Sequence, residues 1–130
     1  MTSAARVEAL LEELGLTDRT TRVAENVWTL KKGSAPNAPI VQIIAAPDFV
    51  VATAKIADRT PDGDREAFYR TLLETNVGLL GAFFTLEANG SIRLNQVLPV
   101  DWLQDKELAF IVGNVAARAE DLLPLVTERK

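Results

Sequence analysis

The chain has 130 residues, the usual size of one domain, and a chain of this length buries roughly two thirds of the surface that its unfolded form exposes. We therefore expect a single domain over residues 1–130. The composition, 48% hydrophobic and 25% charged, is that of an ordinary globular protein, and no apolar run is long enough to cross a bilayer. The net charge of -4 disfavours binding to nucleic acid and to anionic membranes.

Histidine and cysteine are both absent from the sequence. These two side chains most often supply a base, a nucleophile or a transition-metal ligand near neutral pH, and cysteine alone can form disulfides. We therefore predict a protein that is not an enzyme, with no catalytic residues, no metal and no cofactor. The first residues carry Glu8, Glu12 and Glu13 in place of a basic and then apolar signal segment, so we expect a cytoplasmic protein.

The first predicted elements are a helix and a strand. Apolar residues recur at the spacing of one helical face, at Val7, Leu10, Leu11 and Leu14. Ser3 is the expected N-cap and Gly15 the terminator. The residues from Thr21 to Lys31 are then predicted to form one strand, because they are rich in β-branched residues and end in Val-Trp-Thr-Leu.

A hairpin is predicted next, with strands over residues 40–46 and 49–57. Pro47 presets φ for a tight turn and Asp48 can bond its own backbone, so these two residues join the strands. One face of the second strand contains apolar residues at every second position, namely Val50, Ala52, Ala54 and Ile56. The two alanines leave room for a helix to approach the sheet closely, whereas Phe49, Val51, Thr53 and Lys55 lie on the other face.

Two further helices follow from the 3.6-residue spacing. Asp64 is the expected N-cap of the first helix. The spacing places Phe68 and Leu72 on its buried face and Glu66, Arg70 and Glu74 on its solvent-exposed face. The last helix follows residues 101–105 and is long and amphipathic. Pro124 predicts a kink or an end of this helix near residues 121–123.

Between these helices, Asn89 and Gly90 mark the turn of a second hairpin with two competing registers. A two-residue loop would set Leu86 opposite Arg93 and so mix the two faces of the pair. A three-residue loop, with Gly90 left-handed, gives one apolar and one polar side by pairing Leu86 with Ile92, Phe84 with Leu94, and Thr85 with Arg93. We therefore predict the three-residue loop.

This register leaves Phe83 on the polar side, beside Asn95 and close to Val97. A ring on a solvated sheet face indicates that something covers it, and large aromatics dominate interfaces. The predicted protein-binding residues are Phe83, Asn95, Val97 and Trp28. Burial in the core is the alternative for each aromatic residue, Trp102 included.

Several short patterns do not indicate a ligand site. Asp58, Asp62 and Asp64 lack the run of oxygen ligands and the final glutamate of a calcium loop. The glycines at positions 78 and 81 form no phosphate-binding motif and have no lysine at the required offset. Turn and cap chemistry accounts for both stretches.

Together the elements predict a two-layer α+β fold with the order α-β-β-β-α-β-β-α, in which a five-stranded antiparallel sheet carries its helices on one face. This order resembles that of the type III secretion chaperone family and of the related YbjN-like domains. The residues that carry the resemblance are Leu72-Leu73-Glu74-Thr75-Asn76, Gly81-Ala82-Phe83-Phe84-Thr85-Leu86, Asn89-Gly90, Ile92-Arg93-Leu94, Leu98-Pro99, Leu108 and Glu120-Asp121.

The resemblance implies a small acidic homodimer that holds an extended stretch of a partner polypeptide, such as a secreted effector, without catalysis. The YbjN-like resemblance implies instead a regulatory domain that binds a signalling protein or a small ligand. A dimer would form through the outer sheet face or through the last helix. An open sheet edge would let the domain accept a further strand.

Overall fold

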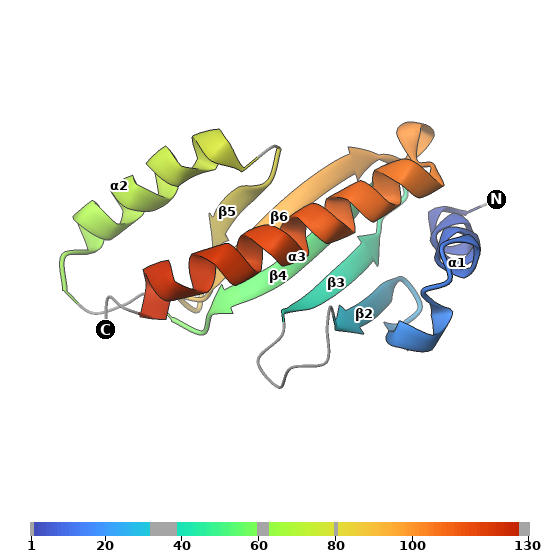
Figure 1. The fold of residues 1–130 in the computed structure, drawn as a ribbon, viewed down its shortest axis with the longest axis horizontal. Coiled ribbons are helices and arrows are strands. Elements are labelled where there is room, and N and C mark those ends of the chain that lie inside the picture. Colours follow the sequence, from blue (N-terminus) through green and yellow to red (C-terminus); the bar gives the residue numbers. More distant parts are fainter. Residues whose placement is uncertain (1, 32–38, 60–62, 80, 128–130) are drawn as a thin grey trace.

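The computed structural model describes residues 2–31, 39–59, 63–79 and 81–127, and they form a two-layer α+β fold (Figure 1). In chain order the elements are α1 (Ser3–Glu13), β1 (Thr20–Ala24), β2 (Val27–Lys31), β3 (Ile40–Ala45), β4 (Phe49–Ala57), α2 (Arg65–Thr75), β5 (Phe83–Leu86), β6 (Ile92–Pro99) and α3 (Asp105–Thr127). Short 3₁₀ turns lie before β1 (η1, Thr17–Arg19), after α2 (η2, Asn76–Gly78) and before α3 (η3, Val100–Trp102).

The sheet is antiparallel and has six strands in the order β1-β2-β3-β4-β6-β5, so the prediction of five strands is wrong by one. The segment predicted as one strand is a tight hairpin, in which Arg22 pairs with Trp28 and Ala24 with Val27. Its turn consists of Glu25 and Asn26, which lack the glycine that usually signals such a hairpin. The predicted fold class and the order of the remaining elements are confirmed.

The N-cap of α1 lies one residue earlier than predicted, so the helix begins at Ser3. The N-cap is Thr2, whose Oγ1 accepts a hydrogen bond from the Ala5 backbone N–H at 3.1 Å. Ser3 instead donates from its hydroxyl to the carbonyl oxygen of Ala46 at 2.7 Å, which ties the helix to the turn between β3 and β4. Gly15 follows the helix with a φ of +71°, as predicted for the terminator.

Both later hairpins have the predicted turns. At the first, the Ala46 N–H donates to the Phe49 carbonyl at 2.9 Å. At the second, Gly90 has a φ of 89° and the Glu87 N–H donates to the Ser91 carbonyl at 2.9 Å, which closes a three-residue loop. The predicted register is confirmed at all three pairs: Leu86 with Ile92, Phe84 with Leu94, and Thr85 with Arg93.

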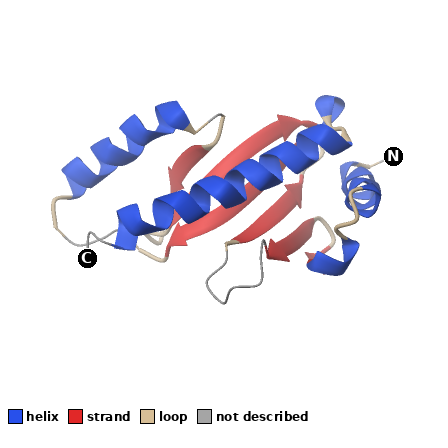
Figure 2. Cartoon of the chain, viewed as in Figure 1, coloured by secondary structure: helices blue, strands red, loops and turns tan. Residues whose placement is uncertain are grey.

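The core lies between the sheet and the helices α1 and α3 (Figure 2), and α2 contributes the buried Phe68 and Leu72 to it, as its spacing predicted. Ala52 and Ala54 of β4 are 0% and 1% exposed, because α3 packs directly across this strand as the small residues predicted. In Figure 1, α2 lies beyond the edge strand β5, away from the centre of the sheet. No helix in the described part of the chain is long and apolar enough to span a membrane.

A buried amide fixes α3 against the sheet. The Asn114 side chain donates to the Leu79 carbonyl at 3.0 Å and to Gln96 Oε1 of β6 at 2.8 Å. Farther along, α3 does not end at residues 121–123, because it continues through Pro124 to Thr127. Pro124 has no backbone N–H to donate to the carbonyl of Glu120, four residues earlier. Because Glu120 is exposed, water can donate to that carbonyl instead.

Candidate protein-binding face

The side of the sheet opposite α1 and α3 is referred to below as the outer sheet face. It consists of the outward residues of β2, β3, β4, β6 and β5, which alternate with the core residues along each strand. Phe49 and Val97 are each 43% exposed here and Phe83 is 37% exposed. These three side chains are apolar and remain partly open to solvent in a single copy of the chain.

Strand register arranges the outer sheet face in rows that cross the strands. The first row is called the apolar row. In it Val27 pairs with Ile44, Ile44 with Val51, and Val51 with Val97. Phe49 and Pro99 form the next pair beyond it, on β4 and β6. Apolar side chains of four different strands therefore meet at one end of the face.

The second, the polar row, consists of Thr29, Gln42, Thr53, Asn95 and Phe83, again in direct register. The Thr53 hydroxyl donates to Asn95 Oδ1 at 2.6 Å, and Asn95 Nδ2 donates to Thr85 Oγ1 at 2.8 Å. Thr53 is only 3% exposed, although it faces outward, because its polar neighbours close over it. The centre of the outer sheet face is therefore a connected hydrogen-bond network.

The third, the cationic row, contains Lys31 on β2, Lys55 on β4 and Arg93 on β6. Lys55 and Arg93 are directly paired, and Lys31 is paired with Ile40 of β3. Lys55 Nζ lies 3.2 Å from the carboxylate of Asp58.

The Arg93 guanidinium is held in place by hydrogen bonds to two strands. Its Nε donates to Thr53 Oγ1 and its Nη2 to Gln42 Oε1, both at 3.0 Å. Its Nη1 lies 3.8 Å from Glu87 Oε1, and the side chain is 19% exposed. A hollow of about 380 Å³ opens over this network, lined by Gln42, Ile44, Val51, Thr53, Thr85, Glu87, Arg93 and Asn95.

Three of the four predicted site residues come together on this face. Phe83 is paired directly with Asn95, and Val97 lies two residues farther along β6. Trp28 lies apart from them on the inner side of β2 and is 1% exposed. Its indole N–H donates to Glu8 and the Arg22 guanidinium lies 5.0 Å from its ring centroid, so we do not include it in the proposed binding face.

Sequence reasoning did not connect β4 to this site. The alternation along β4 placed Phe49, Val51 and Thr53 together, yet nothing local showed that β4 lies beside β6. Arg93 was placed on the polar side of its hairpin, but its contacts with Thr53 and Gln42 depend on strand order. A pairing signal between residues 49–57 and 92–99 would have been needed to find them.

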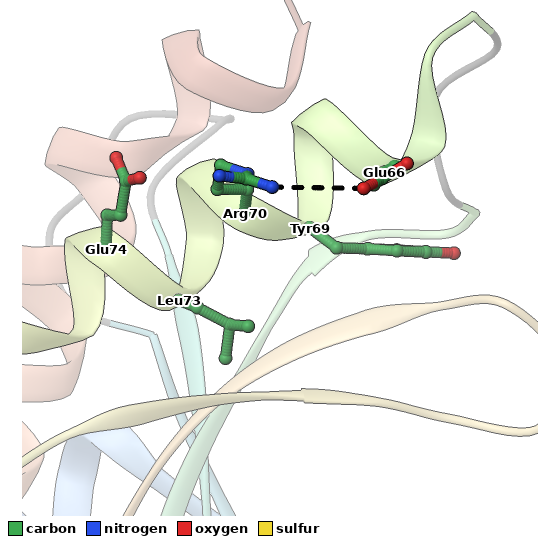
Figure 3. Close-up of a pocket in the computed structure, with 5 residues that line it drawn as sticks. All are labelled: Glu66, Tyr69, Arg70, Leu73 and Glu74. Atoms are coloured by element: carbon green, nitrogen blue, oxygen red, sulfur yellow. Dashed lines mark ion pairs between the residues drawn. The ribbon is translucent and has the colours of Figure 1, made fainter.

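A second surface lies along α2 and is called here the α2 hollow. It is an open depression of about 770 Å³ lined by Glu66, Tyr69, Arg70, Leu73 and Glu74 (Figure 3). Tyr69 and Leu73 extend from one side of the helix, and Leu73 is 69% exposed. Arg70 Nη2 lies 3.8 Å from Glu66 Oε1, an ion pair between residues one helical turn apart.

Comparisons with known proteins give no match in sequence and several in structure. No family model matches the chain, and no curated protein matches its sequence. A chain of the ExsC-ExsE complex is similar over 97% of both chains, with a TM-score of 0.70 and 16% identity. A chain of the ExoU-SpcU complex, from the type III secretion system of Pseudomonas aeruginosa, is similar over 92% of this chain and 97% of its own, with a TM-score of 0.69 and 15% identity.

A third similar structure is that of the Yersinia pestis type III secretion chaperone SycH in complex with a fragment of YscM2. It covers 93% of this chain and 99% of the matched one, with a TM-score of 0.60 and 16% identity. The chain therefore has a type III secretion chaperone-like fold, as the resemblance in its sequence predicted.

Proposed function

We propose that this protein is a non-catalytic chaperone or adaptor that works in the cytoplasm and holds an extended segment of a partner polypeptide. The observation that carries the proposal is the outer sheet face, where Phe83 and Val97 stay exposed beside Asn95. The similar structures support it, because each is named as a complex with a second protein. A secreted effector is the partner that the type III secretion chaperone resemblance implies, and two of the three structures are named for that secretion system.

The geometry of the outer sheet face suits a polypeptide better than a small ligand. The apolar side chains of this face come from four strands and form an extended row. The sheet also ends in two edge strands, β1 and β5, of which β5 carries Phe83. An extended segment can gain backbone hydrogen bonds at such an edge while its side chains occupy the adjacent hollow.

We further propose that the protein is a homodimer whose copies meet at the α2 hollow. This surface combines an exposed apolar residue, Leu73, with both signs of charge, on Arg70 and on the acidic Glu66 and Glu74. The outer sheet face has an excess of cations and would meet repulsion from a second copy. Contact at α2 would also leave the outer sheet face free for the partner polypeptide.

Affinity capture from a lysate of the source cells tests the proposed function. The tagged protein is compared with Phe83→Asp and with a control, Lys106→Glu, which changes charge at an exposed position on α3. We expect Phe83→Asp to lose the captured polypeptide and the control to retain it. Equal recovery by all three proteins would remove the outer sheet face from consideration, and recovery of only a small ligand would favour the regulatory function.

Light scattering tests the dimer separately. We expect the mass of two chains for the wild-type protein and of one chain for Leu73→Asp, because a carboxylate at this position would be desolvated on association. The variant Phe83→Asp should stay dimeric. A strictly monomeric wild-type protein would contradict the proposed dimer.

A further inference from the structure

We infer that the segment held on the outer sheet face is apolar at one end and acidic at the other. This inference rests on the proposed function and adds the chemistry of the partner. The apolar row and the cationic row lie on the same strands, with the polar row between them. On β4 the rows are represented by Val51 and Lys55, which are about 13 Å apart at the rise of a β-strand.

Charge is the first argument for the acidic end. The chain as a whole has a net charge of -4, so its surface is on average acidic. The outer sheet face departs from this average, since its described strands carry three cations there, Lys31, Lys55 and Arg93, against two nearby carboxylates, Asp58 beside Lys55 and Glu87 beside Arg93. A local excess of cations on an acidic protein favours an acidic partner and speeds its association.

The geometry of Arg93 is the second argument. Two of its nitrogens are fixed by hydrogen bonds to Thr53 and Gln42, which orient the guanidinium plane before any partner arrives. Nη1 lies 3.8 Å from Glu87, beyond the range of a good hydrogen bond, so it can still donate to an incoming carboxylate. A preorientated arginine loses little side-chain entropy on binding.

The same rows argue against a second copy as the occupant. If the faces of two copies met about a twofold axis along the strands, the cationic row would face the partner's cationic row. If the axis ran across the strands, the cationic row could instead be buried against the apolar row. Like charges repel and unpaired buried charges are costly, so neither arrangement is favourable.

The spacing of the rows sets the pattern that the segment must carry. In an extended segment the apolar and acidic side chains would be separated by about four residues, at about 3.3 Å per residue. In a helical segment the same distance corresponds to about nine residues. The pattern is therefore a short apolar block, a polar spacer and one or two carboxylates.

Three synthetic fluorescein-labelled peptides test the inference by fluorescence anisotropy. Each has the block Val-Phe-Val and a spacer of serines, followed by two glutamates, two glutamines or two lysines. We expect the glutamate peptide to bind about tenfold more tightly than the lysine peptide, with the glutamine peptide between them. Raising the salt from about 50 mM to about 500 mM should remove most of this difference.

Charge reversal on the protein locates the effect. Lys55→Glu should weaken binding of the glutamate peptide by about fivefold and leave binding of the glutamine peptide nearly unchanged. The matched control Lys106→Glu, an equal charge change on the helical side, should change neither affinity. Equal affinities for all three peptides, no measurable binding of any of them, or equal effects of the two lysine variants would overturn the inference.

The failure of this inference can be told apart from failure of the proposed function. If all three peptides bind equally and Phe83→Asp abolishes their binding, the face still holds polypeptides and only the preference for acidic residues is lost. If Phe83→Asp changes neither peptide binding nor capture from the lysate, the proposed function itself fails.

Discussion

The two faces of the sheet differ sharply although the same strands form both. On β6, Leu94 points toward α3 and is 0% exposed, whereas Val97 points outward and is 43% exposed. The inner face is packed by α1 and α3, and the outer face is held by side-chain hydrogen bonds across the strands. Stability is therefore concentrated on one face, and the other is left available for binding.

The polar groups show the same contrast. Asn114 is buried between α3 and β6, where water cannot replace its partners. Asn95 makes comparable hydrogen bonds on the outer sheet face, but at a half-exposed position. Equal changes on the two faces should therefore have unequal effects on stability.

The largest effect should come from Leu94→Ala. This change removes a fully buried side chain and leaves a cavity beneath α3, so we expect a loss of about 2–5 kcal/mol in the free energy of unfolding. The matched change Val97→Ala on the outer sheet face should cost less than about 1 kcal/mol. Urea denaturation of the two variants measures both losses, and equal losses would show that the outer sheet face is packed as tightly as the core.

Asn114→Ala should have the next largest effect. Gln96 Oε1 and the carbonyl of Leu79 would both lose a buried side-chain donor, which costs about 1–3 kcal/mol. Asn95→Ala should cost less than about 1 kcal/mol, because water can reach the groups that it releases. Thermal unfolding compares the two variants, and a larger loss for Asn95→Ala would contradict the contrast between the faces.

Gly90→Ala should destabilise the hairpin that carries Phe83. The φ of 89° at this position is strained for any residue with a Cβ, at a cost of about 1–2 kcal/mol. Gly113→Ala, in the interior of α3 with open space at its Cβ position, should instead stabilise by about 0.5–1 kcal/mol. Chemical denaturation should show opposite signs, and destabilisation of similar size in both variants would rule out the turn geometry as the cause.

The smallest effect on stability should come from Val97→Thr. Threonine keeps the shape and the strand propensity of valine, so the free energy of unfolding should change by no more than about 0.5 kcal/mol. The affinity for the glutamate peptide should fall about threefold, because a hydroxyl replaces part of the apolar row. Anisotropy and urea denaturation of the same sample separate binding from folding, and an unchanged affinity would exclude Val97 from the contact.

Prediction from the sequence succeeded where neighbouring residues determine the outcome. Asp64 accepts a hydrogen bond from the Ala67 N–H as the predicted cap, and the loop closed by Gly90 sets the register that places Phe83 beside Asn95. It failed at Glu25 and Asn26, whose turn has no glycine or proline to signal it. It also counted Trp28 among the predicted binding residues, although the structure buries this side chain, because one tryptophan in a strand does not reveal which side the helices cover.

The sequence by itself therefore determined the strands' alternation, most of their turns and the composition of each face. Tertiary structure decided that β4 lies between β3 and β6, which brings Gln42, Thr53 and Arg93 together across the outer sheet face. The physical reason is that a turn sets register through local backbone geometry. Strand order depends instead on how α1 and α3 bury the apolar faces of segments far apart in the chain.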